Sequence, residues 1–144
     1  MSIKTCGGQD ALGFLSLTNG ADGDVMWRKL KEVLQQLNKV KDSLQRRHLL
    51  VSTPPQDIED CCCPSALQCF KYNLQQFNLT EREQRKFHRG LKHSLTEKAM
   101  DFCASGQPVN KCKTCDSYPK KNAMEFLQRL ESLIIRAIDI RSRK

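Results

Sequence analysis

The chain has 144 residues, the length of one ordinary domain, of which 39% are hydrophobic and 28% are charged. This composition fits neither a membrane protein nor a wholly disordered chain, and no stretch approaches the roughly 18 apolar residues of a membrane-spanning helix. With 24 Lys and Arg against 16 Asp and Glu, the formal net charge is +8. The charge favours an acidic partner without distinguishing among nucleic acid, a glycosaminoglycan and a protein surface.

The cysteines indicate the compartment, because eight in a chain of this length are typical of an oxidising one. A zinc site instead needs paired Cys-x-x-Cys motifs, or one such motif followed by two spaced histidines. Only Cys112 and Cys115 have that spacing, and the run at 61–63 makes a poor second pair. We therefore expect disulfides, no metal and no cofactor, and we expect His88 and His93 to be surface residues.

The first 23 residues do not form a clear secretory signal. The apolar segment at 11–17 is short, contains Gly13 and follows Asp10. This stretch also holds five of the seven glycines. We expect a flexible tail over residues 1–23, with a weak or absent signal peptide, and one folded domain over residues 24–144.

Beyond this tail, apolar residues recur every three or four positions, which predicts helices. The first helix starts at Asp24 as its N-cap. Its apolar stripe comprises Met26, Leu30, Val33, Leu34, Leu37, Val40 and Leu44. The second helix starts at Pro64, which suits a first helical position. Its stripe comprises Ala66, Leu67, Phe70, Leu74 and Phe77.

Two further helices follow. Thr80 to Glu83 read as a capping box, so the third helix starts near Glu81. Its stripe comprises Phe87, Leu91, Leu95 and Phe102. Asn122 caps the fourth helix, whose stripe comprises Phe126, Leu127, Leu130, Leu133, Ile134, Ala137 and Ile138. No segment shows a convincing strand alternation, so the predicted class is all-α.

The connections between these helices predict the topology. The first covers residues 47–63 and the third covers residues 104–121, whereas the second has only about three residues. Long, short and long connections are typical of the up-up-down-down four-helix bundle. Both long connections contain cysteines, so disulfides that join them are the economical interpretation, although eight cysteines allow roughly 105 pairings.

Two cysteine motifs resemble a known family. The segment Cys112-Lys-Thr-Cys-Asp-Ser-Tyr-Pro-Lys-Lys, with Glu125-Phe-Leu after it, is similar to the last crossover and last helix of the interleukin-21 family. Cys62-x6-Cys69-Phe70 is similar to the start of its second helix. The first motif is highly specific, and the resemblance covers residues 24–140. It implies a short-chain four-helix cytokine with two long crossovers.

The resemblance also implies a function. Members of this family are secreted cytokines, not enzymes, that bind a private interleukin-21-type receptor chain and the common cytokine receptor gamma chain. They signal through Janus kinases and STAT proteins in lymphocytes. We expect this chain to be a secreted, extracellular monomer with no membrane insertion.

The resemblance assigns disulfides as well. The two bridges of the family become Cys62 to Cys112 and Cys69 to Cys115. Four cysteines then remain, namely Cys6, Cys61, Cys63 and Cys103. We expect Cys103, at the end of the third helix, to pair with Cys61 or Cys63.

Two outward faces are candidates for binding the private receptor. On the third helix, basic residues recur on the side away from Phe87 and Leu91, namely Arg82, Arg85, Lys86, Arg89 and Lys92. The outward set of the first helix is Arg28, Glu32, Gln35 and Lys39, with Gln36 at its edge. On pattern alone such a stripe is usually a solvated face, whereas the resemblance implies that both faces contact the receptor. Arginine suits this contact because it binds carboxylates in a bidentate manner.

Surplus apolar residues mark the fourth helix. Ile135 and Ile140 lie off its core stripe, and Ile138 closes that stripe, which indicates a flat contact site. The alternative is that the end of the bundle buries them against the first crossover. The resemblance implies that Ile135 and Ile138 contact the gamma chain, although the family has Gln at the position of Ile135.

One modification site and two competing functions remain. Asn78-Leu79-Thr80 is an N-glycosylation sequon at a predicted exposed turn. No catalytic motif supports an enzyme. The alternatives are a basic, cysteine-rich, zinc-dependent nucleic-acid-binding module and a small disulfide-rich structural or antimicrobial protein. No aromatic residues alternate with the basic ones as a stacking platform, so we expect no nucleic-acid partner.

Overall fold

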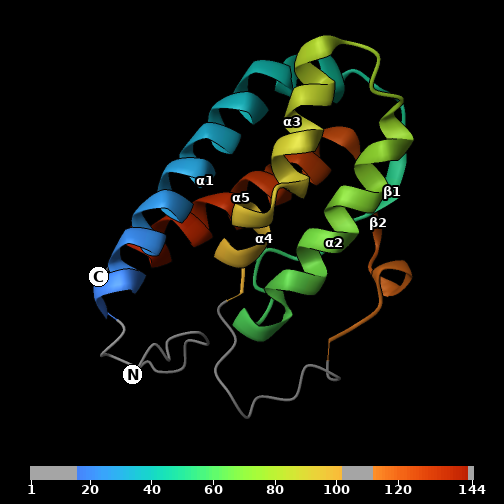
Figure 1. Cartoon of the computed structure of the whole chain (residues 1–144). Coiled ribbons are helices and arrows are strands. Elements are labelled where there is room, and N and C mark those ends of the chain that lie inside the picture. Colours follow the sequence, from blue (N-terminus) through green and yellow to red (C-terminus); the bar gives the residue numbers. More distant parts are fainter. Residues whose placement is uncertain (1–15, 102–111, 143–144) are drawn as a thin grey trace.

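The computed structural model describes residues 16–101 and 112–142. Within these ranges the chain forms helices and two short strands (Figure 1). The helices are α1 (Ser16–Gln45), α2 (Cys63–Leu74), α3 (Arg82–Lys92), α4 (Ser94–Ala99) and α5 (Ala123–Ser142), and the strands are β1 (Leu50–Ser52) and β2 (Lys120–Asn122). Single 3-10 turns precede α2 at Asp60–Cys62, follow it at Gln75–Phe77 and precede β2 at Cys115–Ser117.

The helices form an up-up-down-down bundle. α1 and α2 run in one direction, whereas α3 and α5 run in the opposite one, and the short α4 continues beyond α3 (Figure 1). α1 packs against α5 on one side and against α3 and α4 on the other, and α2 contacts α3 and α5. This arrangement confirms the topology predicted from the lengths of the three connections.

The predicted apolar stripes meet in one core. Its largest buried side chains include Phe70, Phe77, Phe87 and Phe126. The ring centroid of Phe126 lies 5.2 Å from that of Phe70 and 5.3 Å from that of Phe77, so α5 and α2 share an aromatic contact. Four of the predicted stripe residues are only partly buried, namely Met26, Leu34, Leu95 and Ile138. Phe102 lies outside the described residues.

The first helix is longer than predicted. α1 begins at Ser16 and not at Asp24. Asp24 pairs instead with Arg28, one turn further along, at 3.3 Å. Such an i,i+4 ion pair is compatible with the helix interior, so a residue that often caps helices here lies within one. The rest of the predicted tail, residues 1–15, lies outside the described residues.

The third predicted helix differs from the observed one at both ends. Its N-cap is Glu81, one residue after the predicted Thr80, and the backbone N–H of Glu81 donates to Gln84 Oε1 at 3.2 Å. The Gln84 side chain is buried and donates to Ser43 Oγ of α1 at 3.0 Å, so a tertiary contact fixes this cap. The helix then breaks at His93, whose Nδ1 accepts from the N–H of Leu95 at 3.0 Å and caps α4.

The two crossovers meet in a small antiparallel sheet, which we did not predict. Leu50 pairs with Asn122 and Ser52 with Lys120. Three-residue strands are too short for alternation to indicate them. The buried side chain of Asn73, on α2, donates to the Ser52 carbonyl oxygen at 2.9 Å and so holds β1 to the bundle. Asn122 also caps α5 as predicted, since its Oδ1 accepts from the N–H of Glu125 at 2.9 Å.

Candidate functional site

Two disulfides join α2 and the turn before it to the segment that precedes β2. Cys62 is bonded to Cys112 and Cys69 to Cys115, with Cα–Cα distances of 5.4 Å and 5.3 Å. These are the two pairs that the resemblance implies. Because the sulfurs of Cys112 and Cys115 belong to different disulfides, the Cys-x-x-Cys motif has no thiolates to offer zinc, which contradicts the zinc-module alternative.

The neighbouring cysteines are also buried. Cys61 is disulfide-bonded, and the Cys63 thiol donates to the Glu59 carbonyl oxygen at 3.6 Å. The predicted partner, Cys103, and the remaining Cys6 lie outside the described residues.

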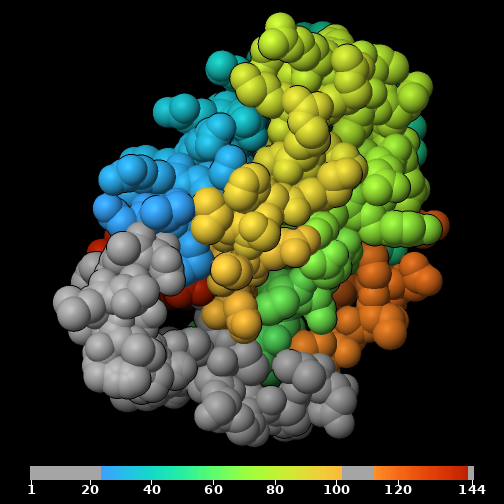
Figure 2. All heavy atoms as spheres, in the orientation of Figure 1, coloured from blue at the N-terminus to red at the C-terminus, as the bar shows by residue number. Residues whose placement is uncertain are grey.

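The basic residues of α3 form one exposed face of the bundle, as the helical period predicts. We call Arg82, Arg85, Lys86, Arg89 and Lys92 the α3 basic face, and all five side chains are exposed. In Figure 2, α3 (yellow) faces the viewer between α1 (blue) and α2 (green). The opposite side of α3 carries the buried Phe87 and Leu91.

The outward set of α1 is exposed with one exception. Arg28, Glu32, Gln35 and Lys39 are exposed, whereas Gln36 is only 8% exposed and faces α3. A Cβ atom placed on Gly90 would lie 2.5 Å from Gln36 Oε1, so the glycine makes room for this side chain between the helices. The prediction that Gln36 lies on the receptor-binding surface is therefore wrong in this structure. A glycine inside an amphipathic helix was the signal for such a close approach.

The apolar residues of α5 divide into exposed and packed ones. Ile135 is 47% exposed, whereas Ile138 and Ile140 pack partly against the core. The first crossover binds to a neighbouring side of α5, where Gln56 donates to Ser132 Oγ at 3.2 Å and Asp60 pairs with Arg136. The crossover therefore leaves Ile135 exposed.

Met124 extends this apolar surface, and we did not predict it. It is 48% exposed and lies about three helical turns before Ile135, on the same side of α5. We call Met124, Ile135 and Ile138 the α5 apolar face. Glu131 lies on the same side and pairs with Lys41 of α1 at 2.9 Å, so α1 borders this face.

His88 is not the surface residue that we predicted. Its Nε2 atom is buried and, within the described part of the chain, has no hydrogen-bond partner. Burial lowers the pKa of His88 below its ordinary 6.5, and the positive charges of Lys92 and Lys71 lower it further, against a hydrogen bond to the Lys71 backbone that raises it. His88 turns toward α2, which covers it, whereas His93 is exposed as predicted.

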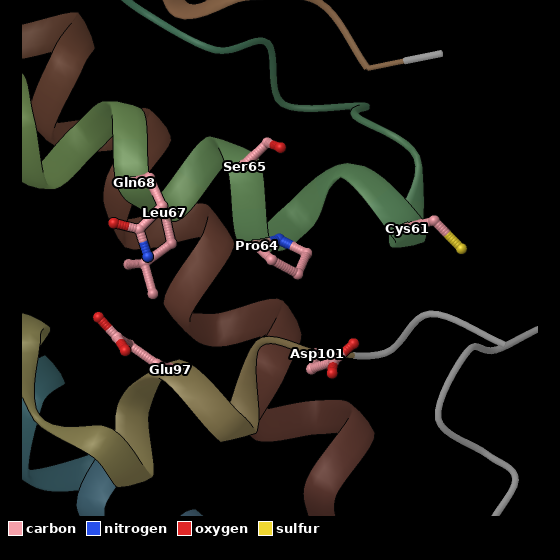
Figure 3. Close-up of a pocket in the computed structure, with 7 residues that line it drawn as sticks. All are labelled: Cys61, Pro64, Ser65, Leu67, Gln68, Glu97 and Asp101. Carbon is pink, nitrogen blue, oxygen red and sulfur yellow. The ribbon is translucent and has the colours of Figure 1, made fainter. Parts of the chain in front are cut away.

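A hollow of about 320 Å³ lies between the start of α2 and α4 (Figure 3). It is lined by Cys61, Pro64, Ser65, Leu67, Gln68, Glu97 and Asp101. The carboxylate of Glu97 pairs with Lys71, and this contact lowers the pKa of Glu97. The main acidic group of the hollow therefore already links α4 to α2, which is a structural role.

The turn between α2 and α3 presents the sequon. Asn78 is exposed and has a φ of 56°, in the left-handed region where Asn is tolerated. Its carbonyl oxygen accepts from Arg47 at 3.4 Å, so the backbone of the turn is held while the side chain points to solvent.

A comparison with known families agrees with this architecture. The family model described as Interleukin 15 matches residues 15–139. The matched residues include all of α1, α2, α3 and α4, all of α5 except its last three residues, and the two disulfides described above. Among the described helices, none has the length and apolar character needed to cross a membrane. The chain therefore belongs to the interleukin 15 family of short-chain helical cytokines, which are signalling ligands and not enzymes.

Proposed function

We propose that this protein is a secreted, monomeric, interleukin-21-like cytokine. It binds a private type I receptor chain through α1 and α3, binds the common cytokine receptor gamma chain through α5, and activates Janus kinases and STAT proteins in lymphocytes. The observation that carries this proposal is the placement of two chemically different faces on either side of α1, one basic on α3 and one apolar on α5. A single ligand with two such faces can hold two receptor chains at once.

The α3 basic face supports a receptor contact with a high rate of association. Five cationic side chains on α3 are exposed, as are Arg28, Gln35 and Lys39 of α1, the helix that packs against α3. Opposite charges on two proteins raise their rate of association and make that rate depend on salt. A private receptor with an acidic surface fits this face.

The α5 apolar face supports a different kind of contact. Ile135 and Met124 are about half exposed, and burying such side chains in an interface releases water from apolar surface. The two disulfides that hold the crossovers support secretion, because such bonds persist in oxidising compartments.

Binding of the two purified receptor ectodomains tests the proposal. We expect Arg85→Glu with Arg89→Glu to slow association with the private chain, to flatten its salt dependence and to leave gamma-chain binding unchanged. Ile135→Asp should do the reverse and weaken gamma-chain binding by about tenfold or more, since it removes a central apolar contact. Ile135→Gln, which matches the family, is the control that should retain most of that binding.

Cells that express both receptor chains supply the functional readout. STAT phosphorylation should fall with either variant, whereas the thermal midpoint of both proteins should stay close to that of the wild type, because these side chains are exposed. If neither ectodomain binds the wild-type protein, the proposal is wrong. If the variant at residues 85 and 89 binds the private chain at the wild-type rate in low salt, α3 does not contact it.

A further inference from the structure

We propose that the α3 basic face is also a binding site for a linear sulfated polysaccharide. At about 100° per residue, its five basic side chains lie within an arc of about 120°, and from Arg82 to Lys92 they extend over about 15 Å along the helix. All five are exposed. Glu83, the exposed acid of α3, falls outside this arc. The arc is therefore a continuous cationic row.

Among the described residues, no carboxylate forms an ion pair with this row of five neighbouring cations. In the described part of the chain, the ion pairs involve other cations, namely Arg28, Lys29, Lys41, Lys71, Arg129 and Arg136. The α3 basic face makes none. Its positive potential is therefore not neutralised from within the protein, and it remains available to an external anion.

The side chains around the row favour a polysaccharide over other anions. Every exposed side chain of α3 is charged, and the apolar side of the helix is buried in the core. A single-stranded nucleic acid needs aromatic residues for base stacking, and an amphipathic membrane helix needs an accessible apolar side. A sulfated chain needs neither, because its sulfates stay ionised and guanidinium groups bind such oxyanions in a bidentate manner.

The disulfides provide a further reason to expect a sulfated polysaccharide and not a nucleic acid. Three cystine-forming residues before and within α2, Cys61, Cys62 and Cys69, are oxidised in this structure. Proteins with such bonds occupy oxidising, mostly extracellular, surroundings, where sulfated polysaccharides rather than nucleic acids are the abundant linear polyanions. The inference therefore commits to a sulfated polysaccharide.

Heparin is the probe for this site, and the full chain is tested without any receptor present. We expect the wild-type protein to bind immobilised heparin with an affinity that falls steeply with NaCl. Lys86→Glu with Arg89→Glu should weaken binding at physiological salt by about tenfold or more, and should reduce the slope of log Kd against log salt by about two, if each reversed charge removes one released counterion.

The control variant makes the same change in net charge elsewhere. Arg46→Glu with Lys120→Glu reverses two exposed cations that lie outside α3. It should keep heparin affinity within about threefold of the wild type, because long-range charge is screened at this salt. Equal losses in the two variants would mean that heparin senses only net charge, and the inference would be wrong. Circular dichroism must show unchanged helicity for both proteins, and Arg82→Gln with Lys92→Gln is the second variant if the first unfolds.

A competition experiment distinguishes this inference from the proposed function. Only this experiment rests on the proposed function, because the heparin-binding measurements above need no receptor. Heparin should block the private chain, which we assign to α1 and α3, and should spare the gamma chain on α5. If heparin binds α3 without blocking the private chain, the polysaccharide site stands and the receptor assignment fails. If heparin does not bind while Arg85→Glu with Arg89→Glu still loses the private chain, the receptor assignment stands and this inference fails.

Discussion

At the scale of single residues, His88 is the group with the clearest dependence on pH. It faces Lys71 of α2, which pairs with Glu97 of α4, and it lies one turn before Lys92 on α3. Its neighbours are thus mainly cationic, and its buried Nε2 has no hydrogen-bond partner among the described residues. A second positive charge at this position is unfavourable, so the folded protein keeps the ring neutral.

This environment predicts how stability changes with pH. Because the folded-state pKa lies below 6.5, the unfolded chain takes up the proton first as the pH falls. The free energy of unfolding should therefore be highest above pH 6.5 and should decline between 6.5 and the lowered pKa. We expect His88→Gln to flatten this decline in urea denaturation series from about pH 7.5 to about pH 5. Parallel pH profiles for the two proteins would show that His88 does not cause the decline.

The residues whose exposure could be predicted from the sequence are those in the middle of the outer side of a helix, far from the border between its buried and exposed sides. The basic residues of α3 point away from Phe87 and Leu91, so the helical period was enough to predict their exposure. Gln36 and His88 lie at the edge between the inner and outer sides. At such an edge, the neighbouring helix determines whether a side chain is buried. Gln36 is buried because Gly90 of α3 leaves space for it, and His88 is partly buried because α2 covers it.

At the scale of elements, the contact of α1 with α3 depends on Gly90. A Cβ atom at this position would lie 2.5 Å from Gln36 Oε1 and 3.2 Å from Val33 Cγ2. Both neighbours belong to α1 and both are buried. The two helices therefore approach more closely here than larger side chains allow.

A bulky residue at this position should push the helices apart. We expect Gly90→Leu to lower the free energy of unfolding by about 1–3 kcal/mol through overpacking, measured by urea denaturation. Arg89→Leu, next to it but exposed, is the control and should change stability by less than about 0.5 kcal/mol. A Gly90→Leu protein as stable as the control would mean that α1 and α3 tolerate a wider spacing.

The elements that sequence reasoning missed are those fixed by distant contacts. β1 and β2 are three residues each, too short for a periodic signal, and the disulfides near β2 and the Asn73 contact at β1 bring the two strands together. The break between α3 and α4 likewise depends on the ring of His93 acting as a cap. The four long apolar stripes, by contrast, needed only local periodicity.

At the scale of the whole molecule, the turn that carries Asn78 lies at one end of the bundle, where α3 begins. Arg85 donates to the carbonyl oxygen of Thr80 at 2.5 Å, so the sequon adjoins the first turn of the α3 basic face. We propose that Asn78 carries a glycan when the protein passes through a eukaryotic secretory pathway.

The glycan should be detected as a loss of mass on treatment with peptide N-glycosidase. Thr80→Ala should abolish this loss, because it removes the sequon while keeping Asn78 and its left-handed backbone. Ser94→Ala, an exposed hydroxyl outside any sequon, is the control and should leave the loss unchanged. A wild-type protein whose mass does not change with the enzyme would contradict the assignment.

The position of α1 between α3 and α5 has a consequence for engineering the proposed signal. A substitution on α1 can disturb both receptor contacts, because this helix borders both faces. Substitutions on α3 or α5 can instead be confined to one. Under the proposed function, an α5 variant that keeps the α3 basic face should occupy the private receptor without recruiting the gamma chain. If the proposed receptor assignment holds, a single substitution at residue 135 should turn the protein into an antagonist.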